Sequence, residues 1–165
     1  MNCYLIRHAI AEDLSAPSKR DDASRALTAR GRVRMRIAAR GLLALGVRPQ
    51  RVLTSPLLRA RETAAILVEE LGAGGETLWP GLAPGGGATQ VEPGLPALEN
   101  LMLVGHEPDL GALAAYWLGG GQRPQLVFRK GACACLSFPA RPAAAGARLE
   151  WLLQPRQLRA LALSA

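Results

Sequence analysis

Three short apolar runs of the chain each end at a histidine, an arginine or a hydroxyl side chain. The three junctions are Leu5-Ile6-Arg7-His8, Leu53-Thr54-Ser55 and Val104-Gly105-His106. Apolar runs of this length, separated by longer segments of helical periodicity, are typical of the buried strands of a parallel α/β sheet. Because parallel strands end at the same edge of a sheet, we expect these junctions to meet in one crevice. The chain has only two histidines, and both lie at such a junction.

The order of the expected elements predicts an α/β fold, a three-layer α/β/α sandwich with a mainly parallel central sheet. Besides the three strands at the junctions, we expect strands at residues 77–79, 126–128, 132–138 and 148–153. Helices are expected at 28–45, at 56–71, at 109–118 and from Pro155 onward. A single helical turn is expected at 96–100. With the length of one ordinary domain, residues 1–165 are predicted to form a single domain.

The composition indicates a protein that does not enter a membrane. Apolar residues make up 49% of the chain, yet no run is long enough to cross a bilayer, and no secretory signal precedes Arg7. We therefore expect a cytoplasmic location. The three cysteines, Cys3, Cys133 and Cys135, form no C-x-x-C pair, so we interpret them as buried thiols and not as disulfides or zinc ligands.

The formal net charge is +7, and the excess of basic residues lies in residues 1–60. Five arginines lie on the helix expected at 28–45, namely Arg30, Arg32, Arg34, Arg36 and Arg40. Such a helix can attract an acidic partner, but it is also typical of a solvated surface. No aromatic side chain lies between these arginines to stack on a base, so no specific nucleic-acid partner is predicted.

The second junction leads into a helix whose first turn would contain Arg59. The N–H groups and the positive dipole end of such a turn favour an anion, and a guanidinium adds a planar fork for phosphate oxygens. Together with Arg7 and His106 from the neighbouring loops, Arg59 is therefore a candidate for phosphate binding. Two histidines beside two arginines would repel a cation, so we predict no metal site.

Three motifs of the chain resemble those of the histidine phosphatase superfamily, and within it the small bacterial phosphohistidine phosphatases of the SixA type. The motifs are Leu5-Ile6-Arg7-His8, Ser55-Pro56-Leu57-Leu58-Arg59-Ala60-Arg61-Glu62-Thr63 and Leu103-Val104-Gly105-His106-Glu107-Pro108. They occur in order and at expected strand ends, and the resemblance extends from Tyr4 to about Leu153. It implies a fold similar to that of phosphoglycerate mutase.

The resemblance also implies a phosphatase that forms a covalent intermediate and needs no metal or other cofactor. His8 would attack phosphorus and form a phosphohistidine, which water then hydrolyses. Arg7, Arg59 and His106 would bind the phosphoryl oxygens and stabilise their charge in the transition state. The implied substrate is phosphohistidine on a partner protein, such as a phosphorelay or phosphocarrier domain.

The chain departs from the family pattern at two places. Ala9 stands where glycine commonly follows the first histidine. Larger members carry a proton-donating carboxylate before the second histidine, whereas Glu76, Glu92 and Glu99 lie here in no donor motif. A missing donor fits phosphohistidine, because an imidazole leaves more readily than an alkoxide. Glu107, directly after the second histidine, is a candidate general acid, or it favours the N-terminus of the next helix.

Two other functions stay open at the level of the sequence. One is a phosphatase of small phosphomonoesters such as sugar or nucleotide phosphates, which an acid role of Glu107 would favour. The other is a phosphate-dependent binding module that keeps the fold without turnover. The intact set of Arg7, His8, Arg59 and His106 argues against the binding module.

Overall fold

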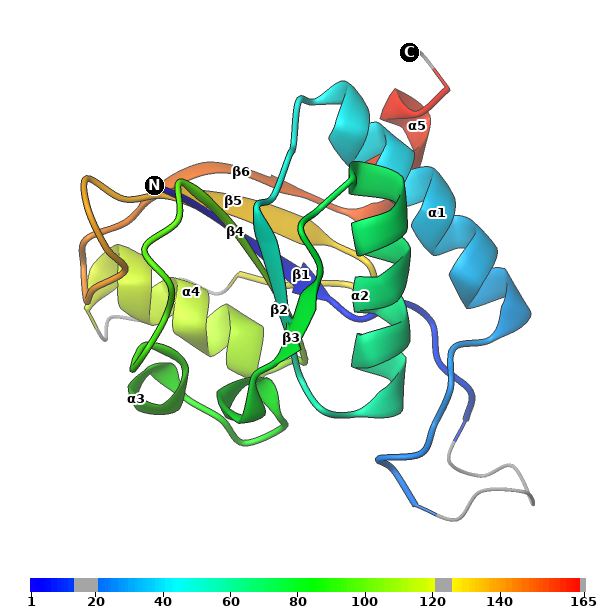
Figure 1. Ribbon diagram of the computed structural model, residues 1–165, viewed down its shortest axis with the longest axis horizontal. Coiled ribbons are helices and arrows are strands. Elements are labelled where there is room, and N and C mark those ends of the chain that lie inside the picture. The colour runs from blue at the N-terminus through cyan, green and yellow to red at the C-terminus, as the bar shows by residue number, and fades with distance from the viewer. Residues whose placement is uncertain (14–20, 121–125, 164–165) are drawn as a thin grey trace.

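A six-stranded sheet with the strand order β3-β2-β4-β1-β5-β6 forms the centre of the protein (Figure 1). The computed structural model describes residues 1–13, 21–120 and 126–163. The strands are β1 (Asn2–Arg7), β2 (Arg51–Thr54), β3 (Glu76–Leu78), β4 (Asn100–Gly105), β5 (Cys133–Ser137) and β6 (Arg148–Leu153). Strands β1 to β4 run parallel, while β5 and β6 extend the sheet in the antiparallel sense. The predicted mainly parallel sheet is confirmed.

Helices cover both faces of the sheet, which confirms the three-layer α/β/α arrangement (Figure 1). One face carries α1 (Ala29–Ala44), α2 (Leu58–Leu71) and α5 (Pro155–Leu161). The other face carries α4 (Asp109–Gly119), the short α3 (Ala88–Val91) and the 3-10 helix η1 (Pro80–Leu82). The side chains of β1 alternate accordingly, with Ile6 on the α1 side and Leu5 on the α4 side. Within the described ranges, no helix has the length and apolar character needed to span a membrane.

The register of the parallel strands aligns their carboxyl ends. Arg7, the last residue of β1, lies opposite Gly105 of β4. Thr54, the last residue of β2, lies opposite Val104 of the same strand. The loops after β1, β2 and β4 therefore start side by side at one edge of the sheet, as the sequence predicts.

Ion pairs between α1 and α2 occupy most of the arginines expected on the first helix. The pairs are Arg32–Glu62, Arg36–Glu69, Arg36–Glu70 and Arg40–Glu70. Surface pairs of this kind contribute little stability each, but they neutralise this side of the helix. The arginines that face α2 thus pair within the protein, whereas Arg34 takes part in none of these pairs.

The three cysteines are buried and carry free thiols, as predicted. Cys133 and Cys135 pack in the core on the α1 side, and Cys3 packs in the core on the α4 side. Burial raises the pKa of the Cys135 thiol to about 11. Because the thiolate is the reactive form, these side chains serve packing and not chemistry.

Two expected elements do not occur in the described residues. Residues 126–128 form no strand, because the backbone of Phe128 bonds to the side chains of Arg7 and Glu107 instead of to a neighbouring strand. Residues 96–100 contain no helical turn, because the backbone at their end already pairs with Asn2 at the start of β1. The helical turns between β3 and β4 lie before residue 96, in η1 and α3.

Candidate active site

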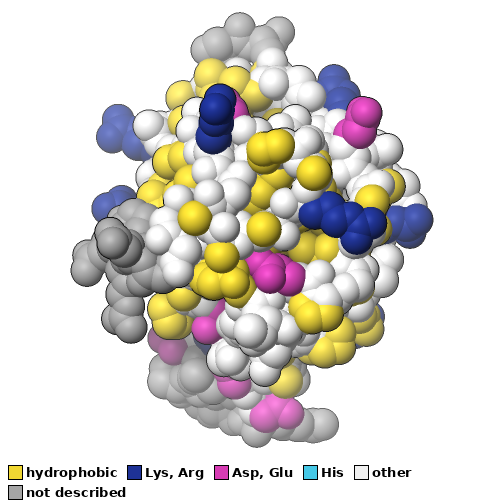
Figure 2. Space-filling model, turned by 90° about the vertical axis from the view of Figure 1, so that its left-hand side faces the viewer, with side chains coloured by type: hydrophobic (Ala, Val, Ile, Leu, Met, Phe, Trp, Pro, Cys, Tyr) yellow, Lys and Arg dark blue, Asp and Glu magenta, His cyan; other side chains and the backbone are white. Residues whose placement is uncertain are grey.

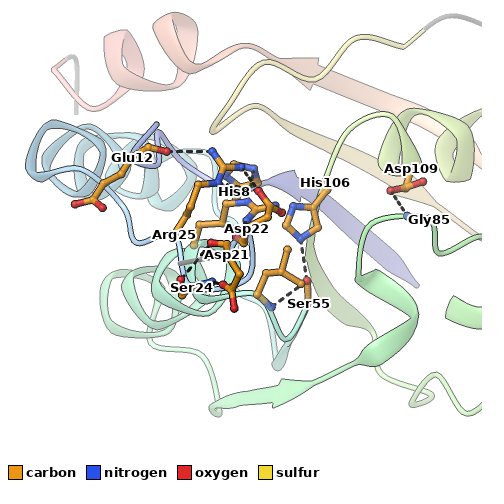
Figure 3. A network of polar contacts seen from close by, with 12 residues as sticks. His8, Glu12, Asp21, Asp22, Ser24, Arg25, Ser55, Gly85, His106 and Asp109 are labelled. Carbon is orange, nitrogen blue, oxygen red and sulfur yellow. Dashed lines mark hydrogen bonds and ion pairs between the residues drawn. The ribbon is translucent and has the colours of Figure 1, made fainter. Parts of the chain in front are cut away.

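The carboxyl edge of the sheet brings together both histidines and one arginine singled out by the sequence. His8 follows β1 and His106 follows β4 (Figure 3). Arg59 lies in the first turn of α2. All three side chains are buried, with relative exposures of 4%, 3% and 3%. The centroids of the two imidazole rings are 5.1 Å apart, and the Arg59 Nε lies 3.3 Å from the His8 Nε2. The predicted convergence is confirmed, and the catalytic roles stay predictions.

The hydrogen bonds of His8 select one neutral form of its ring. Its Nδ1 lies 2.7 Å from the carbonyl oxygen of Ala9, which can only accept, so Nδ1 carries the proton. Its Nε2 accepts from the Nε–H of Arg59 and therefore carries a lone pair. Burial first, and then the charges of His106, Arg59 and Arg7, lower the pKa of His8 to about 3. At neutral pH His8 is thus an uncharged imidazole whose Nε2 can attack an electrophile.

A short network fixes the turn that follows His8. The N–H of Ala9 donates to the Thr63 Oγ1 at 3.0 Å, and this hydroxyl donates to the Arg59 carbonyl at 2.7 Å. The Ala9 side chain is 3% exposed and belongs to the apolar core on the α1 face. The turn therefore accommodates a methyl group where the family commonly has glycine. Thr63 connects the backbones on both sides of the site.

Sequence reasoning missed Asp22, which lies against Arg59. The Arg59 Nη2 donates to the Asp22 Oδ2 at 2.9 Å, and Nη1 donates to the Asp22 carbonyl at 2.7 Å. Arg25 pairs with the other carboxylate oxygen at 2.7 Å (Figure 3). Partial burial would raise the pKa of Asp22, but the hydrogen bonds and charges of Arg59 and Arg25 outweigh it and lower this pKa. An ionised Asp22 thus holds the guanidinium of Arg59 in place.

Ser55 holds His106 instead of capping α2. The Ser55 Oγ lies 2.8 Å from the His106 Nε2 and accepts from the Leu57 N–H at 3.3 Å. Helix α2 begins only at Leu58, so the expected start of this helix at residue 56 is wrong. The physical reason is the contact with His106, which uses the hydroxyl. A hydroxyl can both donate and accept, and when the Ser55 hydroxyl donates to Nε2, the ring proton of His106 lies on Nδ1.

His106 is also neutral at physiological pH, and its Nδ1 has no partner. Burial first, and then the charge of Arg59, lowers the pKa of His106 to about 4. In the described part of the chain, only two buried side-chain N or O atoms lack a hydrogen-bond partner, the His106 Nδ1 and the Arg7 Nε. A buried N–H without a partner costs free energy. The Arg7 Nε–H is a donor that a bound anion would satisfy, and so is the His106 Nδ1 in the tautomer that carries its proton there.

The backbone of Phe128 connects Arg7 with Glu107. The Arg7 Nη1 donates to the Phe128 carbonyl at 2.8 Å, and the Phe128 N–H donates to the Glu107 Oε1 at 2.9 Å. Burial lowers the pKa of Arg7, and the nearby carboxylate of Glu107 opposes this effect. A guanidinium keeps its charge at neutral pH. Glu107 thus positions the loop that holds Arg7, and its role as a general acid stays a prediction.

The three glutamates of residues 72–100, a segment that the structure describes completely, do not serve as proton donors beside the two histidines. Glu76 and Glu99 lie at the amino ends of β3 and β4, opposite to the edge that carries the histidines. The Glu92 Oε1 accepts from the Trp117 Nε1 at 2.6 Å. The lack of a donor motif in this part of the sequence therefore agrees with where these three carboxylates lie.

The site combines a neutral nucleophile with fixed positive charge. His8 offers the lone pair of Nε2, while Arg7 and Arg59 offer donors for the oxygens of a phosphoryl group, and the unpartnered Nδ1 of His106 adds one when it carries the ring proton. Among the residues that the structure describes, no three histidine, cysteine, aspartate or glutamate side chains come together as a possible metal site. This arrangement suits the transfer of a phosphoryl group to a histidine.

Comparisons with known proteins identify the family. The sequence pattern of the histidine phosphatase superfamily (branch 1) matches residues 3–83. The chain belongs to the histidine phosphatase superfamily. An uncharacterized protein of Picosynechococcus sp. is similar to this chain, with 42% identity over 120 residues, 69% of this chain and 71% of that protein.

Solved structures of SixA proteins share the fold of this chain over nearly its full length. The protein histidine phosphatase SixA, complexed with tungstate, has a TM-score of 0.81 and 27% identity, and the match covers 96% of this chain and 99% of that one. A protein of Nakamurella multipartitia assigned to SixA has a TM-score of 0.75 and 25% identity, with 93% and 95% covered. Within the superfamily, this chain is therefore similar in structure to SixA.

Proposed function

We propose that this histidine phosphatase hydrolyses phosphohistidine on a partner protein, through a covalent phosphohistidine at His8. The proposal rests mainly on the protonation state of the His8 ring. Its Nδ1 proton is bonded to the Ala9 carbonyl, and its unprotonated Nε2 lies 3.3 Å from the Arg59 guanidinium. A neutral imidazole beside fixed positive charge is suited to attack a phosphoryl group. The similarity to SixA structures supports the substrate class.

Two displacements at phosphorus make up the proposed reaction. In the first, the Nε2 of His8 forms a bond to phosphorus as the N–P bond of the substrate breaks. The substrate ring leaves as a neutral imidazole when its other nitrogen carries a proton. In the second, water attacks phosphorus, the N–P bond to His8 breaks, and phosphate leaves with the proton released to solvent. His8 keeps its Nδ1 proton throughout, because the Ala9 carbonyl holds it.

The positive groups of the site would stabilise the transferring phosphoryl group. Phosphoryl transfer requires mainly positioning and compensation of charge on the equatorial oxygens. Arg59 is fixed by Asp22, Arg7 by the Phe128 carbonyl, and His106 by Ser55, so each donor is oriented before the substrate binds. Donors that need no reorganisation contribute most to transition-state stabilisation.

The carboxylates near the site favour a leaving group that departs without an acid from the enzyme. Asp22 is ionised at neutral pH, because its pKa is lowered by Arg59 and Arg25 against the effect of burial. Glu107 accepts from the Phe128 N–H. An alkoxide leaving group needs a proton in the transition state, whereas a protonated imidazole ring does not. A phosphoramidate substrate therefore fits this site better than an alkyl phosphate ester.

A comparison of substrates tests the proposal. The rates for a phosphohistidine-bearing phosphorelay or phosphocarrier domain would be measured against aryl and alkyl phosphates, with and without a strong chelator. We expect phosphohistidine and activated aryl phosphates to react much faster than alkyl phosphates, and the chelator to have no effect. Equal rates for alkyl phosphates would favour a phosphatase of small phosphomonoesters. Loss of activity on chelation, restored by a divalent cation, would contradict a metal-independent reaction.

A further inference from the structure

A cavity of about 420 Å³ opens beside the active site, between the loop after β1, helix α1, the residues before β5 and the start of α5. Its apolar part is lined by the buried side chains of Met35 and Ala38. Arg7 and Ala9 line the cavity as well, and both adjoin His8 in the chain. The cavity therefore continues the active site toward α1 and α5.

Six cationic side chains line this cavity: Arg7, Arg34, Arg129, Lys130, Arg156 and Arg159. No aspartate or glutamate is among the residues that line it. Within the described ranges, the ion pairs use other arginines. Burial, and then the positive charges of Arg34 and Arg30, lower the pKa of Arg159. The cavity thus concentrates positive charge that no ion pair between described residues neutralises.

This concentration of charge is local. On the other side of α1, Arg36 and Arg40 pair with glutamates of α2. Figure 2 shows the side of the molecule on which α4 lies, and there the lysine and arginine side chains among the described residues are scattered among hydrophobic, uncharged and acidic groups. A concave surface lined by one sign of charge raises the local concentration of counter-ions far more than scattered charges do.

We propose that this cavity binds a compact polyanion built of linked phosphate groups, and that such an anion reaches Arg7 and competes with the phosphoryl group at His8. The cavity lies in the range of about 300 to 1,000 Å³ that is usual for small-molecule sites. Guanidinium forks match phosphate oxygens in geometry as well as in charge. The inference goes beyond the proposed function, because binding requires no turnover.

Other anions fit the cavity less well. No aromatic side chain lines it, so it offers no surface on which nucleic-acid bases could stack. An acidic protein segment spreads its charges along an extended chain, whereas the cationic groups here surround one concave space. A short phosphate chain places several charges within that space.

Calorimetric titration with tripolyphosphate tests the proposal without any turnover. The wild type would be compared with Arg34→Ala/Arg159→Ala, which removes two half-buried cations of the cavity. The matched control is Arg141→Ala/Arg148→Ala, which removes two exposed arginines outside the cavity and changes the net charge equally. We expect Kd to rise at least about tenfold in the first variant and to change less than about twofold in the control.

No binding to the wild type, equal weakening in both variants, or unchanged binding in Arg34→Ala/Arg159→Ala would overturn the proposal. If circular dichroism shows that this variant does not fold, the exposed pair Arg129→Ala/Arg156→Ala takes its place with the same expected result. A hexaglutamate peptide is expected to bind more weakly than tripolyphosphate. Tighter binding of the peptide, lost in the cavity variant, would assign the cavity to acidic protein segments and overturn the proposal.

Discussion

Lowering the pH from 7 to 5 is expected to destabilise the folded protein through its two buried histidines. The pKa of His8 is lowered to about 3 and that of His106 to about 4, both from an ordinary value of 6.5, and burial is the main cause. Below pH 6.5 the unfolded chain therefore binds protons that the folded protein does not bind until the pH approaches 4. The two neutral histidines therefore do not lower the unfolding free energy above pH 6.5. The unfolding free energy falls as the pH drops from 6.5 toward 4, because the unfolded chain takes up protons there.

The size of the effect follows from these values. Each histidine costs about 2 kcal/mol of unfolding free energy between pH 7 and pH 5, and the two together cost about 4 kcal/mol. Urea denaturation at the two pH values measures this difference for the wild type, His8→Gln and His106→Gln. Each variant should lose about 2 kcal/mol of the pH-dependent difference, because it lacks one histidine and shares all other ionisable groups with the wild type.

The same pH dependence in all three proteins would refute this reasoning. An independent measurement is the NMR titration of the imidazole signals in the folded wild type. We expect no titration of either ring near pH 6.5, and a ring that titrates there would show that the fold does not keep it neutral.

Substitutions of three residues test individual side chains of the site. Arg59→Ala should remove about 3 kcal/mol of transition-state stabilisation from kcat/KM, and Arg59→Lys should restore little because lysine lacks the planar fork; near-normal rates for the lysine variant would contradict this role. Ser55→Ala should lower kcat about tenfold by releasing the second histidine. The control Thr54→Val removes a buried hydroxyl bonded to neither histidine, and an equal effect there would indicate packing alone. Glu107→Gln should leave phosphohistidine hydrolysis unchanged, because glutamine still accepts from the Phe128 N–H. If it selectively abolished alkyl phosphate turnover, Glu107 would be a general acid.

The convergence of the histidines could be predicted from the sequence because it depends on local patterns and one general rule. Short apolar runs identify the strands, and parallel strands place their carboxyl ends at one edge. His8 and His106 directly follow two of these strands, β1 and β4, which are neighbours in the sheet. No long-range contact had to be known to place these residues together.

The partners of these residues could not be predicted, because tertiary contacts choose them. Asp22 lies in a polar segment without periodicity, and only the adjacent acidic pair Asp21-Asp22 in a basic region distinguishes it. The Ser55-Pro56 pair has the local pattern of a helix start, but the hydroxyl bonds to His106, which is 51 residues away. A helix-start pattern depends only on neighbouring residues, so it does not reveal a contact with a residue far along the chain.

The missing strand at 126–128 has a similar origin. Leu126-Val127-Phe128 has the composition of a strand. In the structure, the Val127 carbonyl accepts from the Gln154 side chain, and both backbone groups of Phe128 bond to Arg7 and Glu107. The backbone of this segment thus serves the active site and α5 instead of a sheet. Strand propensity describes side chains and does not reveal where backbone hydrogen bonds go.

The central claim is that His8 carries the phosphoryl group between the two steps of the reaction. Its most direct test is to mix the protein with a radiolabelled phosphohistidine protein, quench within one turnover, and locate the label by peptide mapping. We expect an acid-labile label on His8 in the wild type, and neither label nor turnover in a folded His8→Ala variant. Label on another residue, no label in the wild type, or turnover by His8→Ala would contradict the covalent mechanism.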